Sequence, residues 1–224
     1  MASRQFAAAR VFIPVLGVLA ARVASRHAAT PVRLSVATLH AAALTSPRAP
    51  NDSLDHPYLL VAIAGSHGQT STIHLPASGH FQISHGEALA AGPLTDVRLE
   101  PNDSIRVLIS VLAGQTMRSA DEDSAASASR EVSRAGASVR LKELFAALFP
   151  VTSRGDHWLG SALLLVTNEN GTPYWRTLEC VATCKVLTPP GPRALGTDAP
   201  VVGVVELSGG GATYHLQVHA ARAP

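Results

Sequence analysis

The chain has 224 residues, of which 46% are hydrophobic, and its formal net charge is +2. This length allows one well-buried core, and the composition excludes a chain that is disordered throughout. The charge is unevenly distributed, because residues 1–51 hold six arginines and no acidic residue, which leaves 12 basic against 16 acidic residues in the remainder. A basic start on an acidic body argues against a nucleic-acid-binding protein, whose basic groups should cluster on the folded surface.

The first 30 residues are expected to form a separate basic and apolar segment. Arg4 and Arg10 precede the apolar run 11–21, as in a secretory signal. The segment is also free of acids and rich in Ala, Arg and Ser, as in an organellar transit peptide; an attachment tail or a helix packed on its own domain is a further interpretation. The run is shorter than the about 20 residues that a membrane-spanning helix needs. The compartment stays open, with a secreted, periplasmic or membrane-associated location favoured over an organellar one.

The pattern of residues 31–224 predicts one antiparallel β-sandwich domain of about eight strands. Alternating apolar residues indicate a strand at 105–111, and the run 58–63 is apolar on both faces, as expected of a central strand. Asn51, Asn102 and Asn170 lie in tripeptides that match glycosylation acceptors but are also ordinary turn formers, and all three are expected in surface loops. Further strands are expected at 32–36, 162–166, 175–186 and 201–207, and the segments 70–75 and 80–84 alternate more weakly. Short strands separated by Gly, Asn and Pro turns are typical of a sandwich or barrel.

The last predicted strand, 213–220, alternates clearly between apolar and polar residues. Alternate residues from Tyr214 to Val218 are expected to face the core, and His215 and His219 to face outward. These two histidines would be about 13 Å apart along one strand face, too far to bind one ion. The ten histidines of the chain therefore do not predict a metal site.

The two cysteines lie in the predicted strand 175–186. A regular strand places Cys180 and Cys184 on the same face, about 13 Å apart, so no disulfide is expected between them. Their spacing also differs from a Cys-x-x-Cys zinc or redox motif. They are expected to be small, buried core residues.

An insertion at 113–154 interrupts the strands. Its Ser- and Ala-rich part, 119–138, predicts a loop. The segment 141–149, which Pro150 ends, predicts a short amphipathic helix. The apolar stripe of that helix consists of Leu141, Leu144, Phe145 and Leu148. We interpret the stripe either as a cap on one end of the sandwich or as a surface that docks a partner protein or a membrane.

Two motifs about a hundred residues apart resemble the loops of the calcium-dependent phospholipid-binding domains of protein kinase C and synaptotagmin. Asp-His-Pro-Tyr at 55–58 is similar to the string that ends the first calcium loop of that family, and Asp-His-Trp-Leu-Gly at 156–160 to the string that ends the third. The resemblance covers roughly residues 32–170 and implies a β-sandwich that binds phospholipid membranes. The chain departs from the family pattern where His56 separates Asp from Pro, and where Ala49 stands in place of another Asp.

The carboxylates near these motifs are the candidate ligands for calcium, namely Asp52, Asp55 and Asp156. Calcium takes six to eight oxygen ligands, usually with several carboxylates, so this set predicts weak binding at best. The alternative is that the three residues cap turns. No other cofactor is expected.

Catalytic motifs are weak in this chain. The sequence Gly-Ser-His-Gly at 65–68 places a nucleophile beside a base, but adjacent turn residues rarely form the required hydrogen bond and no oxyanion motif follows. We therefore expect a non-enzymatic binding module, foremost a protein-docking or structural subunit of a larger assembly. One alternative is a peripheral phospholipid-membrane binding module with weak or lost calcium dependence, and another is a secreted glycan-binding protein or hydrolase.

Overall fold

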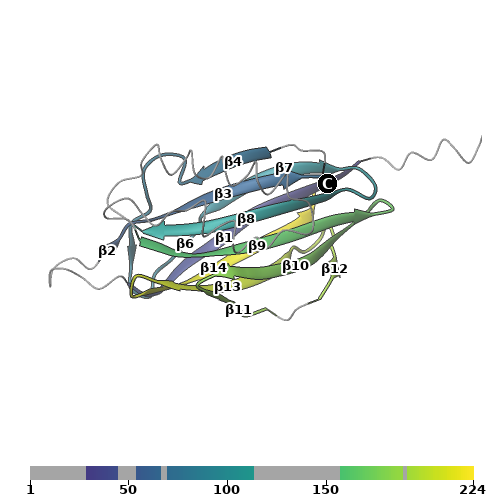
Figure 1. Cartoon of the computed structure of the whole chain (residues 1–224). Helices are drawn as coiled ribbons and strands as arrows, with labels where there is room; N and C mark the ends of the chain where they lie inside the picture. Colours follow the sequence, from purple (N-terminus) through teal and green to yellow (C-terminus); the bar gives the residue numbers. More distant parts are fainter. Residues whose placement is uncertain (1–28, 45–53, 67–69, 114–156, 189–190) are drawn as a thin grey trace, which may run out of the picture.

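The computed structural model describes residues 29–44, 54–66, 70–113, 157–188 and 191–224 (Figure 1). These residues form antiparallel sheets, which confirms the predicted all-β class. The described part contains fourteen strands where the sequence predicted eight, because several strands of two or three residues join the longer ones. The strands are β1 (Thr30–Ala43), β2 (Leu54–Asp55), β3 (Pro57–Gly65), β4 (Thr70–Leu75), β5 (Ile83–Ser84), β6 (Ala88–Leu89), β7 (Gly92–Leu99), β8 (Ser104–Ala113), β9 (His157–Glu169), β10 (Thr172–Ala182), β11 (Cys184–Val186), β12 (Arg193–Ala194), β13 (Val201–Gly209) and β14 (Ala212–Arg222). The predicted inserted helix lies outside the described residues.

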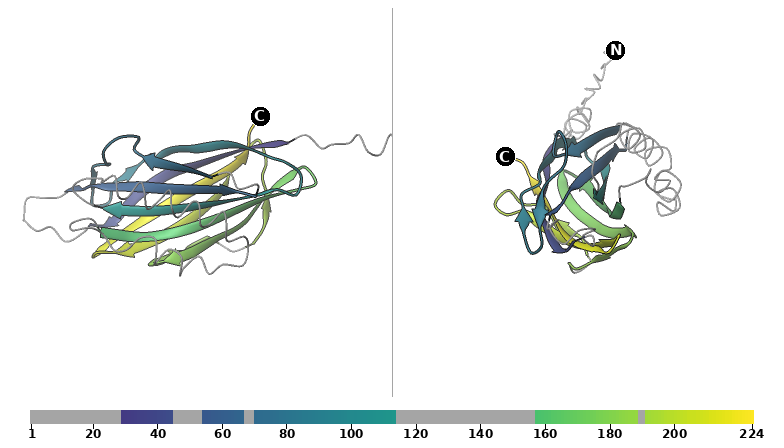
Figure 2. Two further views of the ribbon diagram at one scale, coloured as in Figure 1. Left: turned by 45° about the horizontal axis from the view of Figure 1, so that its top comes forward. Right: turned by 90° about the vertical axis from the view of Figure 1, so that its left-hand side faces the viewer.

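The strands form two six-stranded sheets that pack face to face (Figures 1 and 2). The first sheet has the order β11-β13-β14-β1-β6, and β7 pairs with β1 on the same side as β6. The second sheet has the order β12-β10-β9-β8-β3-β4. A small two-stranded sheet of β2 and β5 lies at one end. The chain therefore crosses between the layers several times, as a sandwich requires.

The core lies between the two sheets and is built by alternation. Tyr214, Leu216 and Val218 of β14 are fully buried, as predicted, and they face the second sheet. Leu59 and Val61 of β3 contribute from the opposite side. Because successive side chains of a strand point to opposite faces, the period of two in the sequence becomes two interdigitating layers.

Two of the three predicted turns are confirmed by backbone geometry, and the third, at Asn51, lies outside the described residues. Asn102 has a φ of 68° and Asn170 a φ of 54°. This left-handed region is disfavoured for most residues but is accessible to Asn. The turns join β7 to β8 and β9 to β10.

The sequence prediction missed β7, which forms an edge of the first sheet. Its register with β1 runs from Thr30 opposite Leu99 to Val36 opposite Gly92. The strand contains a proline and two charged residues, and few of its side chains are buried. An edge strand needs no regular apolar alternation, because only part of it packs against the core. Only the pairing with β1 therefore makes it recognisable.

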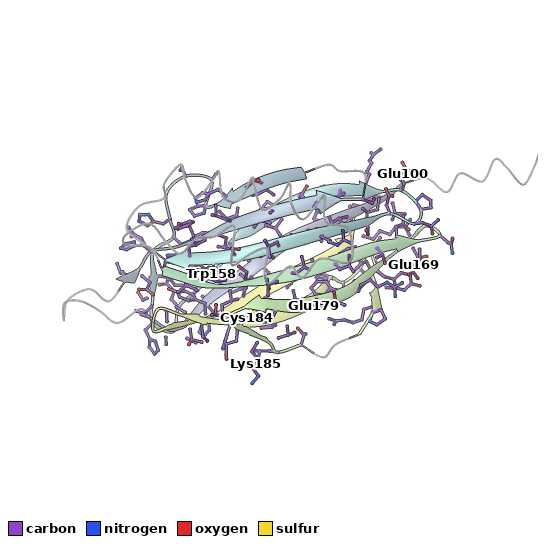
Figure 3. All side chains as sticks on the ribbon, in the orientation of Figure 1. Glu100, Trp158, Glu169, Glu179, Cys184 and Lys185 are labelled. Atoms are coloured by element: carbon purple, nitrogen blue, oxygen red, sulfur yellow. A yellow bond between two sulfur atoms is a disulfide. The ribbon has the colours of Figure 1, made fainter. Side chains whose placement is uncertain are left out.

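The second sheet is apolar on its outer face as well as on its inner face. A separate cluster of buried side chains forms there, which we call the outer apolar face: Tyr58, Leu60, Ala62, Ala64, Leu108, Leu112, Leu163 and Val181. Trp158 packs against this cluster and lies near one end of the sheet, whereas Glu169 lies at the other end (Figure 3). This second cluster explains why β3 is apolar at both its odd-numbered and its even-numbered positions, which point to opposite faces of the sheet.

Candidate functional site

A pocket of about 350 Å³ lies between β4 and β7, which are the outermost strands on one side of the two sheets in the described part of the chain. Its apolar part comes from Ile63, Val97, Leu99 and Ile105, which belong to β3, β7 and β8. Its polar part comes from Ser66, Ser71, Thr95, Arg98, Glu100, Asp103 and Ser104. The pocket thus combines an apolar surface with hydrogen-bonding groups and charges of both signs, a composition suited to binding.

One polar contact shapes the rim of this pocket. The Ser66 hydroxyl donates a hydrogen bond of 2.9 Å to Oδ1 of Asp103. This contact joins the turn after β3 to the turn before β8, and the backbone N–H of Ser66 also donates to the carbonyl of Ser104. The serine of the predicted Gly-Ser-His-Gly motif therefore has a structural partner, and His67 lies outside the described residues.

A buried carboxylate and a buried phenol meet at the opposite end of the sandwich. The Tyr214 hydroxyl donates a hydrogen bond of 2.7 Å to Oδ2 of Asp55, and both residues are buried. Burial raises the pKa of Tyr214 well above its usual value, and the hydrogen bond and the negative charge of Asp55 raise it further. The bond links β2 to β14, so it ties the small sheet to the first sheet.

The calcium prediction concerned Asp52, Asp55 and Asp156. Asp52 and Asp156 lie outside the described residues. Within the described ranges, no group of three or more His, Cys, Asp or Glu side chains is arranged to hold a metal ion. Asp55 accepts the hydrogen bond from Tyr214, and the calcium site stays a prediction from the sequence. The predicted partner-docking residues Leu141, Leu144, Phe145 and Leu148 also lie outside the described residues.

A row of ionisable side chains crosses the outer face of the first sheet. His40 of β1, His215 of β14 and Glu206 of β13 stand opposite one another in the strand register. The rings of His40 and His215 are 5.5 Å apart, and Nε2 of His215 lies 3.4 Å from Oε2 of Glu206. His219 follows on the same strand, and burial lowers its pKa. The sequence predicted the outward direction of His215 and His219 but made no prediction for His40, and the row itself depends on which strands pair.

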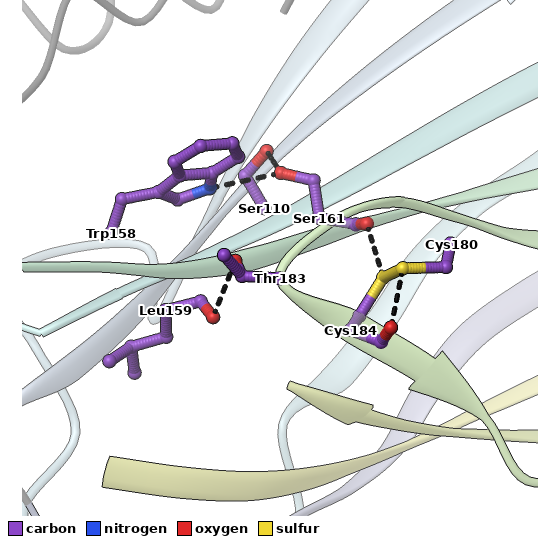
Figure 4. Close-up of a disulfide and its surroundings, with 7 residues drawn as sticks. All are labelled: Ser110, Trp158, Leu159, Ser161, Cys180, Thr183 and Cys184. Atoms are coloured by element: carbon purple, nitrogen blue, oxygen red, sulfur yellow. Dashed lines mark hydrogen bonds between the residues drawn. A yellow bond between two sulfur atoms is a disulfide. The ribbon is translucent and has the colours of Figure 1, made fainter. Parts of the chain in front are cut away.

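The two cysteines form a disulfide, so the prediction of two separate thiols was wrong (Figure 4). The predicted strand 175–186 is broken at Thr183, whose φ is 48°. There the chain leaves the second sheet at the end of β10 and enters the first sheet as β11. This corner brings the Cα atoms of Cys180 and Cys184 to 5.4 Å, within the range for a disulfide. Cys180 is also exposed rather than buried.

Polar groups support this corner from β9. Oγ1 of Thr183 donates a hydrogen bond of 3.1 Å to the carbonyl oxygen of Leu159, and Sγ of Cys184 lies 3.0 Å from the carbonyl oxygen of Ser161. Ser161 Oγ accepts a hydrogen bond of 3.1 Å from Nε1 of Trp158 and lies 2.6 Å from Oγ of Ser110 (Figure 4). Both serines are fully buried. Their hydroxyls are satisfied by each other and by the indole, as buried polar groups require.

Among the residues that the structure describes, no helix is both long enough and apolar enough to cross a bilayer. The pocket between the sheet edges, the Tyr214–Asp55 pair and the disulfide corner are the chemically distinctive parts of the described fold. The sequence matches no protein-family model, and a search of the curated proteins finds no match to it.

Proposed function

We propose that this chain is a non-enzymatic β-sandwich module that binds an extended segment of a partner protein beside β4. The observation that carries the proposal is the position of the pocket, which lies between β4 and β7, the outermost strands of the two sheets among the described residues. Each of these strands has one paired neighbour in the described part of the chain, β3 for β4 and β1 for β7.

The two edges differ in how well they could accept another strand. β7 carries Pro93, Asp96 and Arg98, and prolines and charges are typical devices that prevent pairing at an edge. β4 has the sequence TSTIHL, with neither an acidic residue nor a proline, Lys or Arg. Its β-branched residues favour an extended conformation. β4 is therefore the edge that favours addition of a strand.

The pocket supplies what such a docking site needs for specificity. In strand addition, main-chain hydrogen bonds provide affinity, and pockets for alternate side chains select the sequence. A segment beside β4 could place an apolar side chain against Ile63 and Val97 while polar atoms meet Thr95 and Arg98 at the rim. The described lining contains no His, the most frequent general base, and no Cys, a frequent nucleophile. This composition favours binding over catalysis.

The disulfide supports a location for this module in an oxidising compartment, such as the secretory pathway or the periplasm. Disulfides persist there and are rare in the cytosol. Both cysteines of the chain are in this bond. This location agrees with the secretory-signal interpretation of the first 30 residues, which stays a prediction.

Site-specific photo-crosslinking in the native cell tests the proposal. A photoreactive residue replaces Thr72, which is exposed on β4, and in a control it replaces Ser208, which is exposed on β13. We expect a discrete cross-linked product from position 72 that disappears when Ser71→Lys places a charge beside the pocket. The cross-linked partner segment, made as a peptide, should then bind the purified protein but not the Ser71→Lys variant. Identical products from positions 72 and 208, or a peptide that binds both proteins equally, would refute the proposal.

A further inference from the structure

We infer that the outer apolar face of the second sheet is covered by this chain's own segment 141–148, through its apolar stripe. This inference is independent of the proposed docking site beside β4. It assigns an intramolecular role to residues that the sequence alone left open between capping and partner docking. The argument combines the burial of the face, the distribution of its polarity, and the reach of the chain.

Burial shows that the outer apolar face needs a covering layer. Tyr58 is 0% exposed, Leu60 and Leu112 are 2% exposed, and Leu163 is 5% exposed. All members of the cluster come from neighbouring strands of the second sheet, β3, β8, β9 and β10. Side chains stand nearly perpendicular to a sheet, so neighbours on one face cover each other's flanks but not their tips. Exposures this low are typical of a face that packs against a further layer.

The serines in the middle of the face point to the same conclusion. Ser110 and Ser161 lie directly opposite each other in the register of β8 and β9, and both are 0% exposed. Their hydroxyls, 2.6 Å apart, satisfy each other and the Trp158 indole. Serines on a solvent-facing sheet surface can use water instead, so this closed arrangement is typical of an interior.

The covered part lies at the end where the chain leaves the sheet. Ala113, the last residue of β8, pairs with His157, the first residue of β9. One residue farther into the sheet, Leu112 of β8 pairs with Tyr58 of β3. Farther along the same face, Arg106 and Leu165 are only half-buried. The face is therefore apolar and buried near the exit of segment 114–156 and becomes polar away from it.

The connection between β8 and β9 can reach this face and fits its size. Leu148 is nine residues before His157, and nine residues span at most about 30 Å. A helix over the eight residues from 141 to 148 would be about 12 Å long. The buried rows from Tyr58 to Ala62 cover about 13 Å along β3. The tether also gives the stripe a high effective concentration at the face, which an outside partner lacks.

The other apolar segment of the chain is attached at the wrong end. The run 11–21 precedes β1, whose first residue, Thr30, donates a hydrogen bond of 3.0 Å to the carbonyl oxygen of Gly171. Gly171 lies in the turn between β9 and β10, at the end opposite Ala113 and His157. Segment 141–148 is therefore the better placed occupant within the chain.

Photo-crosslinking in the folded protein tests the contact. Benzoyl-phenylalanine replaces Phe145 in one protein and Ala146 in the control, since position 146 lies opposite the stripe on a helix of 3.6 residues per turn. We expect position 145 to give a cross-link within a monomer, mapped by mass spectrometry to 58–64, 108–112 or 158–163, and position 146 to give none there. Cross-links from position 145 only to a second chain, or none to these peptides, would overturn the inference.

Tryptophan emission gives a second, independent measurement. The chain has two tryptophans, so Trp175→Phe leaves Trp158 as the only reporter beside the face. In that background Phe145→Asp should shift the emission of Trp158 to longer wavelength and increase its quenching by acrylamide, whereas Ala146→Asp should change neither. Light scattering tests the rival occupant of the face, a second copy of the chain. If the parent protein is a dimer and Leu60→Asp converts it to a monomer, the inference is overturned in favour of that second copy. Equal spectra for the two aspartate variants would also overturn it.

Discussion

Replacing Tyr214 by phenylalanine should destabilise the folded protein and change how its stability depends on alkaline pH. The Tyr214 side chain is fully buried, and its hydroxyl donates a 2.7 Å hydrogen bond to the carboxylate of Asp55, which is 6% exposed. Phenylalanine keeps the ring and its packing but removes the donor. The variant therefore isolates the hydrogen bond between β14 and β2.

The expected loss follows from the charge and burial of the acceptor. A hydrogen bond to a charged group contributes about 1.5–3 kcal/mol, and a buried acceptor that loses a donor adds a desolvation penalty. We expect the free energy of unfolding at pH 7 to fall by about 2–3 kcal/mol. For a domain of this size the melting temperature should fall by about 5–10 °C.

The pH dependence has a definite sign. Burial, then the hydrogen bond and the charge of Asp55, raise the pKa of Tyr214 above the unfolded value of 10.0. Above pH 10 the unfolded chain releases the phenolic proton while the folded protein retains it. The stabilisation is therefore complete below pH 10 and is lost as the pH rises further, with a slope of up to about 1.4 kcal/mol per pH unit. The variant lacks this group, so its stability should approach that of the parent protein between pH 9 and pH 11.

Urea unfolding followed by tryptophan fluorescence at pH 7 and from pH 9 to pH 11 checks both expectations. Tyr174→Phe is the matched control, because it removes the same hydroxyl from a half-buried ring that stacks with Arg176 on β10. A Tyr214→Phe protein as stable as the parent at pH 7 would refute the reasoning. So would a stability difference that stays constant or widens from pH 9 to pH 11.

Two further predictions concern the packing of the sheets and the corner between them. A Cβ at Gly203 would lie 2.5 Å from the ring of Trp175, so Gly203→Ala should lower the free energy of unfolding by about 1–3 kcal/mol in urea titrations. Gly196→Ala, whose Cβ meets its first neighbour at 4.0 Å, should stay near the parent value, and equal stabilities of the two variants would contradict the packing argument. Replacing Cys180 and Cys184 together by serine should cost about 2 kcal/mol, the chain-entropy value for so short a loop, and lower the melting temperature in calorimetry. Dithiothreitol should lower the melting temperature of the parent protein by a similar amount and leave the serine variant unchanged; a reductant effect on both proteins would count against the disulfide as its cause.

The candidate site could be predicted from the sequence only in part. The Asp-His-Pro-Tyr string drew attention to Asp55, but its carboxylate accepts a hydrogen bond from Tyr214, 159 residues away. The pocket lining comes from β3, β4 and β7 with the adjoining turns and β8. No local pattern joins these segments, because the pocket exists only where two sheet edges end side by side.

The disulfide shows how one backbone angle can reverse a local prediction. The alternation from Trp175 to Val186 is compatible with a continuous strand, in which the two thiols cannot meet. The left-handed conformation of Thr183 turns the chain into the other sheet and brings the cysteines together. Nothing about a threonine marks such a corner, so tertiary pairing decides it.

The sequence by itself determined the all-β class, most of the long strands, the inward side of β14 and the turns at Asn102 and Asn170. These features follow from short-range physics, namely the two-residue period of a strand and the conformations that particular residues tolerate. Only the tertiary structure decided the edge strand β7, the corner at Thr183, the partner of Asp55 and the burial of the outer apolar face. Each of these depends on which distant segments lie next to one another, and that choice is made by the packing of the whole chain rather than by any local stretch of it.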